Sequence, residues 1–295
     1  MSATLTHKPV ICRAALLEAA SSLRLVGATA SASARLIRML CDETVGADEL
    51  SIRIERDPVL CARVLRVANS AYYAQQRSVT SIRRALIVVG LNAVRGIAAA
   101  ACIDQVMPPR IAALPDTSAL LRHSLATGLA SEMLAACRFP ALMTEAFIAG
   151  LLHNLGVIIQ AIVDPSGTTA MIASLGSRTP TDIRALERHH AAIAHEDAIA
   201  VVFDAWQLPH SLIAAASHHH LPAEAPENHR PLAMLVGTAA RLSATHGNAF
   251  SLEPTGPGLD SDSESTGLLQ LSERELAGFR EELPKRVTHL LAALG

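Results

Sequence analysis

The sequence is poor in aromatic residues and offers no cysteine pairing, and both deficits narrow the classes of protein that it can encode. Only 3% of the 295 residues are aromatic, while 50% are hydrophobic. Ala, Leu, Ile and Val must therefore fill the core, which favours helices over a β-sandwich. The five cysteines are odd in number, scattered, and never form a C-x-x-C pair. We therefore expect a reduced, cytoplasmic protein.

Excess charge and membrane-spanning runs are also missing. The formal net charge is −2, so the chain offers no electrostatic basis for binding nucleic acid or an anionic membrane. The first residues lack the cationic start, apolar run and cleavage site of a signal peptide. The most hydrophobic window, Leu86 to Met107, is interrupted by Asn92, Arg95 and Asp104. We expect neither nucleic acid nor a membrane among the partners.

What the chain does contain is helical periodicity over most of its length, without alternating strand patterns or a repeat. Prolines 108, 109 and 115 mark a connector between two halves, and a stretch rich in Ser, Gly, Pro and acidic residues precedes the last helix. The predicted divisions are a loose N-terminus at 1–14, an N-terminal helical subdomain at 15–108, a second helical subdomain at 116–245, a flexible loop at 251–267 and a C-terminal helix at 268–295.

Capping residues predict several helix ends. Asp57 before Pro58 is an N-cap with proline at the first helical position. Ser81 begins another helix. Ser272 with Glu275 three residues later is a capping box, which opens the last amphipathic helix.

The stretch Ala146 to Gln160 (AFIAGLLHNLGVIIQ) is apolar almost all the way round and too short to cross a bilayer. This pattern predicts one helix at the centre of a soluble core. We therefore expect at least one of Leu151 and Leu152 to be fully buried.

Two glycines flank His153 within this stretch. Gly150 and Gly156 lie three residues before and after it, on its side of the predicted helix. Each costs about 1 kcal/mol relative to alanine in a helix interior, so something must come close to the backbone there. The sequence leaves two explanations open, which are another helix packed tightly and a pocket.

Histidines are the residues best suited to carry chemistry, because the chain has 13 of them and neutral imidazole is a common transition-metal ligand. Helices that face one core can gather such ligands from distant positions. For the triplet at 218–220 a solvated helix end is the alternative. No glycine-rich phosphate loop, G-x-S-x-G elbow or recognisable Cys–His pair occurs. The candidate metal ligands are His123, His153, His190, His218 and His219.

Several sequence patterns follow one another in a fixed order. They are Ile54–Leu60 (IERDPVL), Leu65–Tyr73 (LRVANSAYY), Ser81–Leu86 (SIRRAL), His123–Thr127 (HSLAT), Ala149–Gly156 (AGLLHNLG) and Trp206–Pro209 (WQLP) leading to His218-His219. Over roughly residues 15–245 the chain resembles HDOD domains, relatives of the HD and HD-GYP phosphohydrolases. The resemblance implies an all-α fold, with an N-terminal helical bundle packed on an HD-like helical subdomain.

The chain departs from the hydrolytic relatives at one decisive position. Their central doublet is His-Asp, in which the aspartate binds or bridges metal ions, whereas here it is His153-Asn154. An amide oxygen is neutral, so it is a poorer ligand and cannot offset the charge of two ions. The GYP signature is also missing, because LPAEAP follows His220. The resemblance therefore implies a degenerate pocket.

We accordingly expect a non-catalytic bacterial signal-transduction or regulatory module that binds signalling proteins or a ligand. No catalytic or cofactor-binding residue is expected, and the one cofactor considered is a single divalent transition metal. The alternative is a metal-dependent phosphohydrolase of the HD superfamily that uses the five candidate histidines. Asn154 favours the first hypothesis. The sequence does not identify the partner, the input signal or the oligomeric state.

Overall fold

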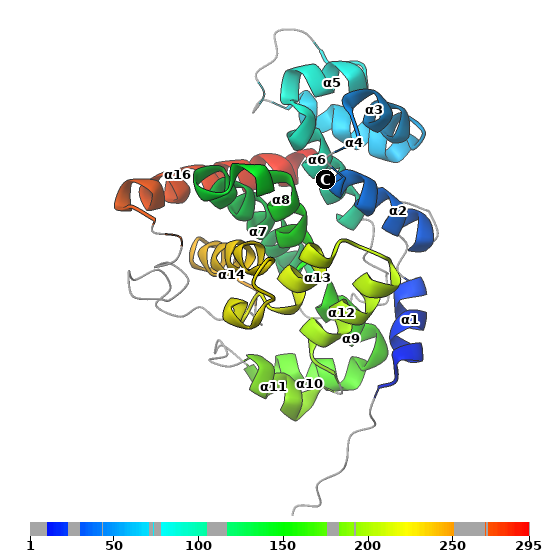
Figure 1. Cartoon of the computed structure of the whole chain (residues 1–295), viewed down its shortest axis with the longest axis vertical. Helices are drawn as coiled ribbons and strands as arrows, with labels where there is room; N and C mark the ends of the chain where they lie inside the picture. The colour runs from blue at the N-terminus through cyan, green and yellow to red at the C-terminus, as the bar shows by residue number, and fades with distance from the viewer. Residues whose placement is uncertain are drawn as a thin grey trace, which may run out of the picture.

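The computed structural model is helical, which confirms the all-α expectation (Figure 1). It describes residues 11–22, 30–42, 44–70, 73, 78–104, 117–175, 183–191, 193–250, 269 and 271–294, and these ranges contain no strand. The helices before residue 105 are α1 (Arg13–Ser22), α2 (Ala30–Cys41), α3 (Ala47–Glu55), α4 (Pro58–Ala68), α5 (Ile82–Val89) and α6 (Leu91–Asp104).

The second half supplies the other described helices. They are α7 (Thr117–Arg138), α8 (Met143–Leu152), α9 (Leu155–Val163), α10 (Pro165–Leu175), α11 (Ile183–His190), α12 (His195–Ala205), α13 (His210–Ser217), α14 (Arg230–Thr245) and α16 (Glu273–Leu294), with short 3-10 turns at Pro140–Leu142 and Pro222–Glu224. Helix α7 runs through the middle of the molecule and packs against α8, α14 and α16.

The N-terminal bundle is joined to this core through α6. Helices α3, α4 and α5 pack on one another, and α6 packs against both α4 and α8. Figure 1 shows α3 to α5 at one end of the molecule and α9 to α12 towards the other. Helix α1 lies against α9 and α12, so the first helix of the chain contacts the second half.

Local sequence signals set the helix ends as predicted. The Asp57 side chain accepts a hydrogen bond from the Leu60 backbone N–H, 3.0 Å away, at the start of α4. Ser81 accepts one from the Arg84 N–H at the start of α5. Ser272 and Glu275 form the reciprocal capping-box hydrogen bonds at the start of α16.

The central apolar stretch is buried as expected, but the prediction of one helix is wrong. Leu151 and Leu152 are each only 1% exposed. The helix is interrupted at His153-Asn154, where α8 ends and α9 begins. The His153 Nδ1 atom lies 2.6 Å from the Gly150 carbonyl oxygen. In a continuous α-helix the Gly150 carbonyl would accept a hydrogen bond from the backbone N–H of Asn154. The His153 side chain competes for that carbonyl, so the series of helical hydrogen bonds is interrupted at the histidine.

Both flanking glycines lie against neighbouring backbone, so tight packing is the explanation that the structure supports. A Cβ atom on Gly150 would lie 2.8 Å from the Thr127 carbonyl oxygen of α7, and one on Gly156 would lie 2.0 Å from the His195 carbonyl oxygen. Glycine thus lets α7 approach α8, and lets the start of α12 approach α9 beside the histidine.

One stretch, Pro140–Val163, is long and apolar enough to cross a membrane, but 89% of its most apolar window is buried in the fold. Burial of this kind is typical of a core helix. The connector prolines, the loop at 251–267 and residues 1–10 fall outside the described residues, and the predicted domain divisions stay predictions.

A candidate metal site in a buried histidine cluster

Five histidine rings lie in contact at the centre of the second half. Their ring centroids are 5.3 Å apart for His123 and His153, 4.8 Å for His153 and His219, and 5.3 Å for His219 and His195. His220 lies 4.0 Å from His219 and 5.2 Å from His195. We call these five residues the histidine cluster. They come from α7, the turn between α8 and α9, the start of α12 and the segment after α13.

Four rings of the cluster have Nδ1 beside an oxygen that can only accept a hydrogen bond. The distances from Nδ1 are 2.9 Å to the Asn248 carbonyl for His123, 2.6 Å to the Gly150 carbonyl for His153, 2.7 Å to the Glu187 carboxylate for His195 and 2.8 Å to the Ala216 carbonyl for His219. Nδ1 must therefore carry the proton, and in the neutral ring Nε2 carries the lone pair. Metal-binding histidines in proteins are oriented in this way.

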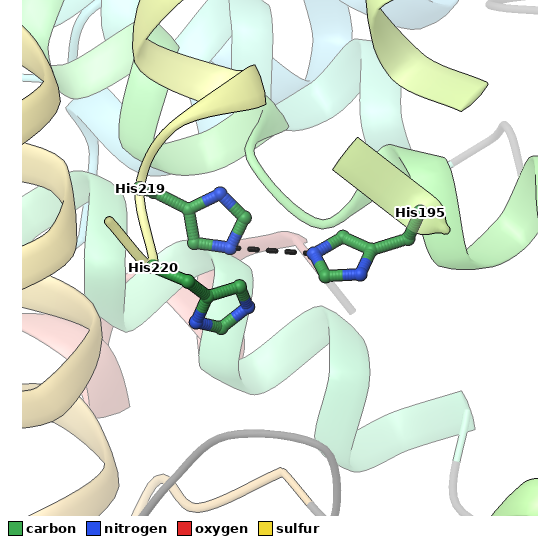
Figure 2. A group of neighbouring side chains, drawn as sticks. All are labelled: His195, His219 and His220. Carbon is green, nitrogen blue, oxygen red and sulfur yellow. Dashed lines mark hydrogen bonds between the residues drawn. The ribbon is translucent and has the colours of Figure 1, made fainter. Parts of the chain in front are cut away.

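Two of these lone pairs face each other. The Nε2 atoms of His195 and His219 are 3.4 Å apart (Figure 2). Facing lone pairs repel unless a proton or a cation lies between them. Two imidazole nitrogens bound to one tetrahedral zinc ion, each at about 2.0–2.1 Å, would be separated by about 3.3–3.4 Å. His220 adds a third nitrogen, and the three ligand atoms all lie within 4.8 Å of one another.

Glu187 holds the His195 ring in place. One carboxylate oxygen accepts hydrogen bonds from the ring Nδ1–H and the backbone N–H of His195, and from the side-chain amide of Gln160 at 3.0 Å. Burial raises the pKa of the Glu187 carboxyl, but attraction to His195 and these hydrogen bonds outweigh burial. The net pKa lies below the ordinary value of 4.5. Glu187 is therefore a carboxylate that orients a candidate ligand.

Glu196 has a different environment beside the same cluster. Its carboxylate pairs with Arg184, with 2.7 Å between Oε2 and Nε, and its other oxygen lies 3.7 Å from His219 Nδ1. Burial raises the pKa of Glu196 above its ordinary value, against the opposing effects of His195 and Arg184. The cluster is thus flanked by two buried acids whose pKa values move in opposite directions.

The structure brings together three of the five predicted ligands, His123, His153 and His219. The other two predicted ligands make different contacts. The ring centroid of His190 lies 4.6 Å from that of His189, and His218 Nδ1 bonds to the Ala214 carbonyl, 3.0 Å away. Their places are taken by His195 and His220, which sequence reasoning missed. The available signal for His195 was the pair His195-Glu196 at the start of a helix. The signal for His220 was its place in the triplet, one residue after the predicted ligand His219. Metal binding by any of these residues stays a prediction.

Asn154 is buried next to His153, with only 3% of its surface exposed. It ends the turn between α8 and α9 and its side chain makes no capping hydrogen bond. A neutral amide at this position supplies no negative charge. The donor set at the centre of the cluster is therefore one of imidazoles without a carboxylate at position 154, which suits one transition-metal ion better than a close pair.

The fold and the histidine cluster together describe a helical protein with a candidate histidine site between its helices. The HDOD domain model matches residues 28–222. Because this is more than half of the chain, the protein belongs to the HDOD domain family.

Solved structures with the same fold have low sequence identity to this chain. A candidate phosphohydrolase from Shewanella amazonensis SB2B is 22% identical, with a TM-score of 0.69 over 96% of this chain and 98% of that one. A candidate signal transduction protein from Marinobacter aquaeolei VT8 is 21% identical, with a TM-score of 0.73 over 98% of this chain and 67% of that one. An HDOD domain protein of unknown function from Geobacter sulfurreducens is 19% identical, with a TM-score of 0.70 over 96% of both chains.

A curated relative is longer than this chain. It is an uncharacterised protein from Treponema pallidum (strain Nichols), 24% identical over 204 residues. The match covers 68% of this chain but only 39% of the relative.

Proposed function

We propose that this HDOD protein is a bacterial signal-transduction module that works by binding, and that its histidine cluster holds one divalent transition-metal ion. The observation that carries the proposal is the pair of Nε2 atoms of His195 and His219, 3.4 Å apart, in rings whose Nδ1 atoms are engaged elsewhere. The proposed setting is the cytoplasm and the proposed partners are signalling proteins. The formal net charge of −2 offers no electrostatic basis for binding nucleic acid.

Three residues would hold the ion, namely His195, His219 and His220. A bound ion would supply a Lewis acid to a ligand in an open coordination position. Glu187 would keep the His195 ring fixed with its lone pair directed at the ion. His195 and His219 are each only 1% exposed, so electrostatic interactions at these two rings are stronger than they would be in water.

The second candidate function is a metal-dependent phosphohydrolase, which the buried histidine cluster and the HD-like fold favour. Two-metal hydrolysis needs negative charge between the ions to offset their repulsion. Asn154 stands where that charge would be supplied, so we propose single-site binding and no turnover of cyclic dinucleotides or simple phosphate esters.

Metal content is the first test. Protein purified without chelator is expected to contain about one equivalent of zinc, iron or manganese, measured by elemental analysis. The His219→Ala variant is expected to lose the ion. His210→Ala, at an exposed histidine on α13, is the matched control and should retain it. Equal metal content in both variants would contradict the site.

Hydrolysis is the second test. Wild type and Asn154→Asp are incubated with manganese or iron(II) and with cyclic dinucleotides and phosphate esters. We expect no turnover by wild type. Hydrolysis that disappears in His153→Ala would replace the binding function by the enzymatic one. Activity that appears only in Asn154→Asp would show that the missing carboxylate is the defect.

A further inference from the structure

A groove of about 440 Å³ lies between α7, the start of α8 and α16, and no residue of the histidine cluster lines it. We call it the α7–α16 groove. Its volume falls within the range of about 300–1,000 Å³ that is common for protein binding pockets. The lining includes two methionines, whose flexible side chains adapt to the shape of a partner. The apolar lining residues are Met133, Ala136, Met143 and Phe279.

Gly278 lines the groove from within α16, and the packing of the fold does not account for a glycine there. A Cβ atom on Gly278 would have nothing within 4 Å, whereas neighbouring backbone lies close to Gly150 and Gly156. A glycine inside a helix lowers the stability of that helix relative to alanine. The open space above Gly278 lets a side chain of another molecule come close to the α16 backbone.

The charged residues that line the groove are mostly acidic. They are Glu132, Glu275, Glu282 and Arg286. Glu132 and Glu275 already form ion pairs with arginines of this chain. The Glu282 side chain is 48% exposed, and its bond with Lys285 uses one of the roughly four acceptor positions of a carboxylate. The groove therefore suits a partner that presents apolar and cationic side chains together.

The chain itself presents such side chains on α5, at one end of the molecule (Figure 1). Residues 44–90 contain seven arginines and four acidic residues, although the whole chain has a net charge of −2. Arg83 pairs with Asp48 of α3, with 2.6 Å between Nη1 and Oδ1. Arg84 is exposed, and no ion-pair partner for it is found among the described residues. Ile87 lies one turn further along α5 and is 70% exposed.

The fold does not require an isoleucine at position 87. An exposed side chain adds little to the core, and isoleucine forms helices less readily than alanine or lysine. On α3, Ile52 lies one turn after Asp48, the partner of Arg83, and is 49% exposed. Apolar and cationic side chains thus occur together on two helices that pack against each other. We call Ile52, Arg83, Arg84 and Ile87 the α3–α5 face.

We propose that the α3–α5 face of one molecule docks into the α7–α16 groove of a second copy of this chain. Ile87 enters the open space above Gly278, and Arg84 lies towards Glu282. Two different surfaces meet, so the contact is head-to-tail and either repeats along a row of molecules or closes into a ring. This contact is separate from the histidine cluster and does not depend on a metal.

Analytical ultracentrifugation of the full chain over a range of concentrations is the direct test. We expect the average mass to rise above that of the monomer as the concentration increases. Ile87→Glu and Gly278→Lys should each remain monomeric. Their matched controls are Leu221→Glu, at another exposed leucine, and Ala277→Lys, at an exposed residue of α16 outside the groove. Both controls should associate like wild type.

Two results would overturn the proposal at this stage. One is a wild-type protein that stays monomeric at every concentration, and the other is association of Ile87→Glu or Gly278→Lys as strong as that of wild type. Thermal melting separates lost contacts from lost folding. Because lysine favours a helix more than glycine does, the melting temperature of Gly278→Lys should stay the same or rise.

Mixing the two monomeric variants tests whether the contact is head-to-tail. Ile87→Glu keeps an intact groove and Gly278→Lys keeps an intact α3–α5 face, so an equimolar mixture should form a dimer of one copy of each. Growth should stop at the dimer, because its two remaining surfaces are the blocked ones. A mixture that stays monomeric overturns the proposal.

Charge reversal tests the proposed pairing. Arg84→Glu and Glu282→Arg should each weaken self-association about tenfold or more, because like charges then face each other. The double variant restores opposite charges and should associate at least about threefold more tightly than either single variant. A double variant weaker than both single variants overturns the proposal. His219→Ala should associate like wild type, which separates a failure of this contact from a failure of the metal site.

Discussion

The two halves of the chain differ sharply in the polar groups that they bury. Among the described residues, those before residue 105 contribute only Ser51 and Arg95 to the buried polar and charged side chains, whereas residues 117–250 contribute sixteen. Burying a polar group is costly unless it is hydrogen-bonded. The second half carries that cost around the histidine cluster, whereas the N-terminal helices pack almost entirely through apolar contacts.

The two halves also differ in what a buried charged side chain does. Arg95 donates to the backbone carbonyls of Asp42 and Val45 and so ties the α2–α3 connection to α6. Glu187 instead directs its hydrogen bonds at His195, a candidate ligand. A buried charge thus supports the backbone in one half and orients a candidate metal ligand in the other.

The largest effect that tests this comparison is expected from Glu187→Ala. Removing a fully buried carboxylate leaves two N–H groups of His195 without their acceptor, and the Gln160 amide keeps only its bond to the Ile193 carbonyl. We expect a loss of about 3–5 kcal/mol in the free energy of unfolding, measured by urea denaturation. Ser51→Ala, at a buried serine of the other half, should cost about 1 kcal/mol. Equal losses would break the comparison.

Apolar packing should not distinguish the halves. Leu60 in α4 and Leu151 in α8 are both only 1% exposed, so truncation of either to alanine should cost about 2–5 kcal/mol. Leu221→Ala, at an exposed leucine, should change stability by less than about 0.5 kcal/mol. If Leu60→Ala and Leu151→Ala both melt like wild type, the placement of the two cores is wrong.

The smallest effect concerns the attachment of α16 to α7. Hydrogen bonds from Arg138 and then from Ser272 lower the pKa of Glu275 from 4.5 to about 2. A lowered carboxyl pKa stabilises the fold above the unfolded value, and this stabilisation is lost as the pH falls from about 4.5 towards 2. Arg138→Gln should flatten this part of the pH–stability curve. An unchanged curve in that variant would show that the pair contributes nothing measurable.

The sequence by itself determined the helices and most of their ends. Asp57, Ser81 and Ser272 cap helices through bonds to residues three positions away, so their effect can be predicted locally. The burial of Leu151 and Leu152 followed from an uninterrupted apolar run. The break at His153-Asn154 was missed, because periodicity does not show that an imidazole will bond to the carbonyl three residues earlier.

Only the tertiary structure decided which histidines meet. The patterns around His123, His153 and His219 indicated three members of the cluster through family resemblance. His195 and His219 are 24 residues apart and come together because α12 and α13 pack on each other. Sequence spacing could not distinguish His190 from His195, or His218 from His220, because the direction of each ring is set by its Nδ1 acceptor and by the packing of the helices around it. The distances between the ring nitrogens, on which metal binding depends, are therefore a property of the packed core.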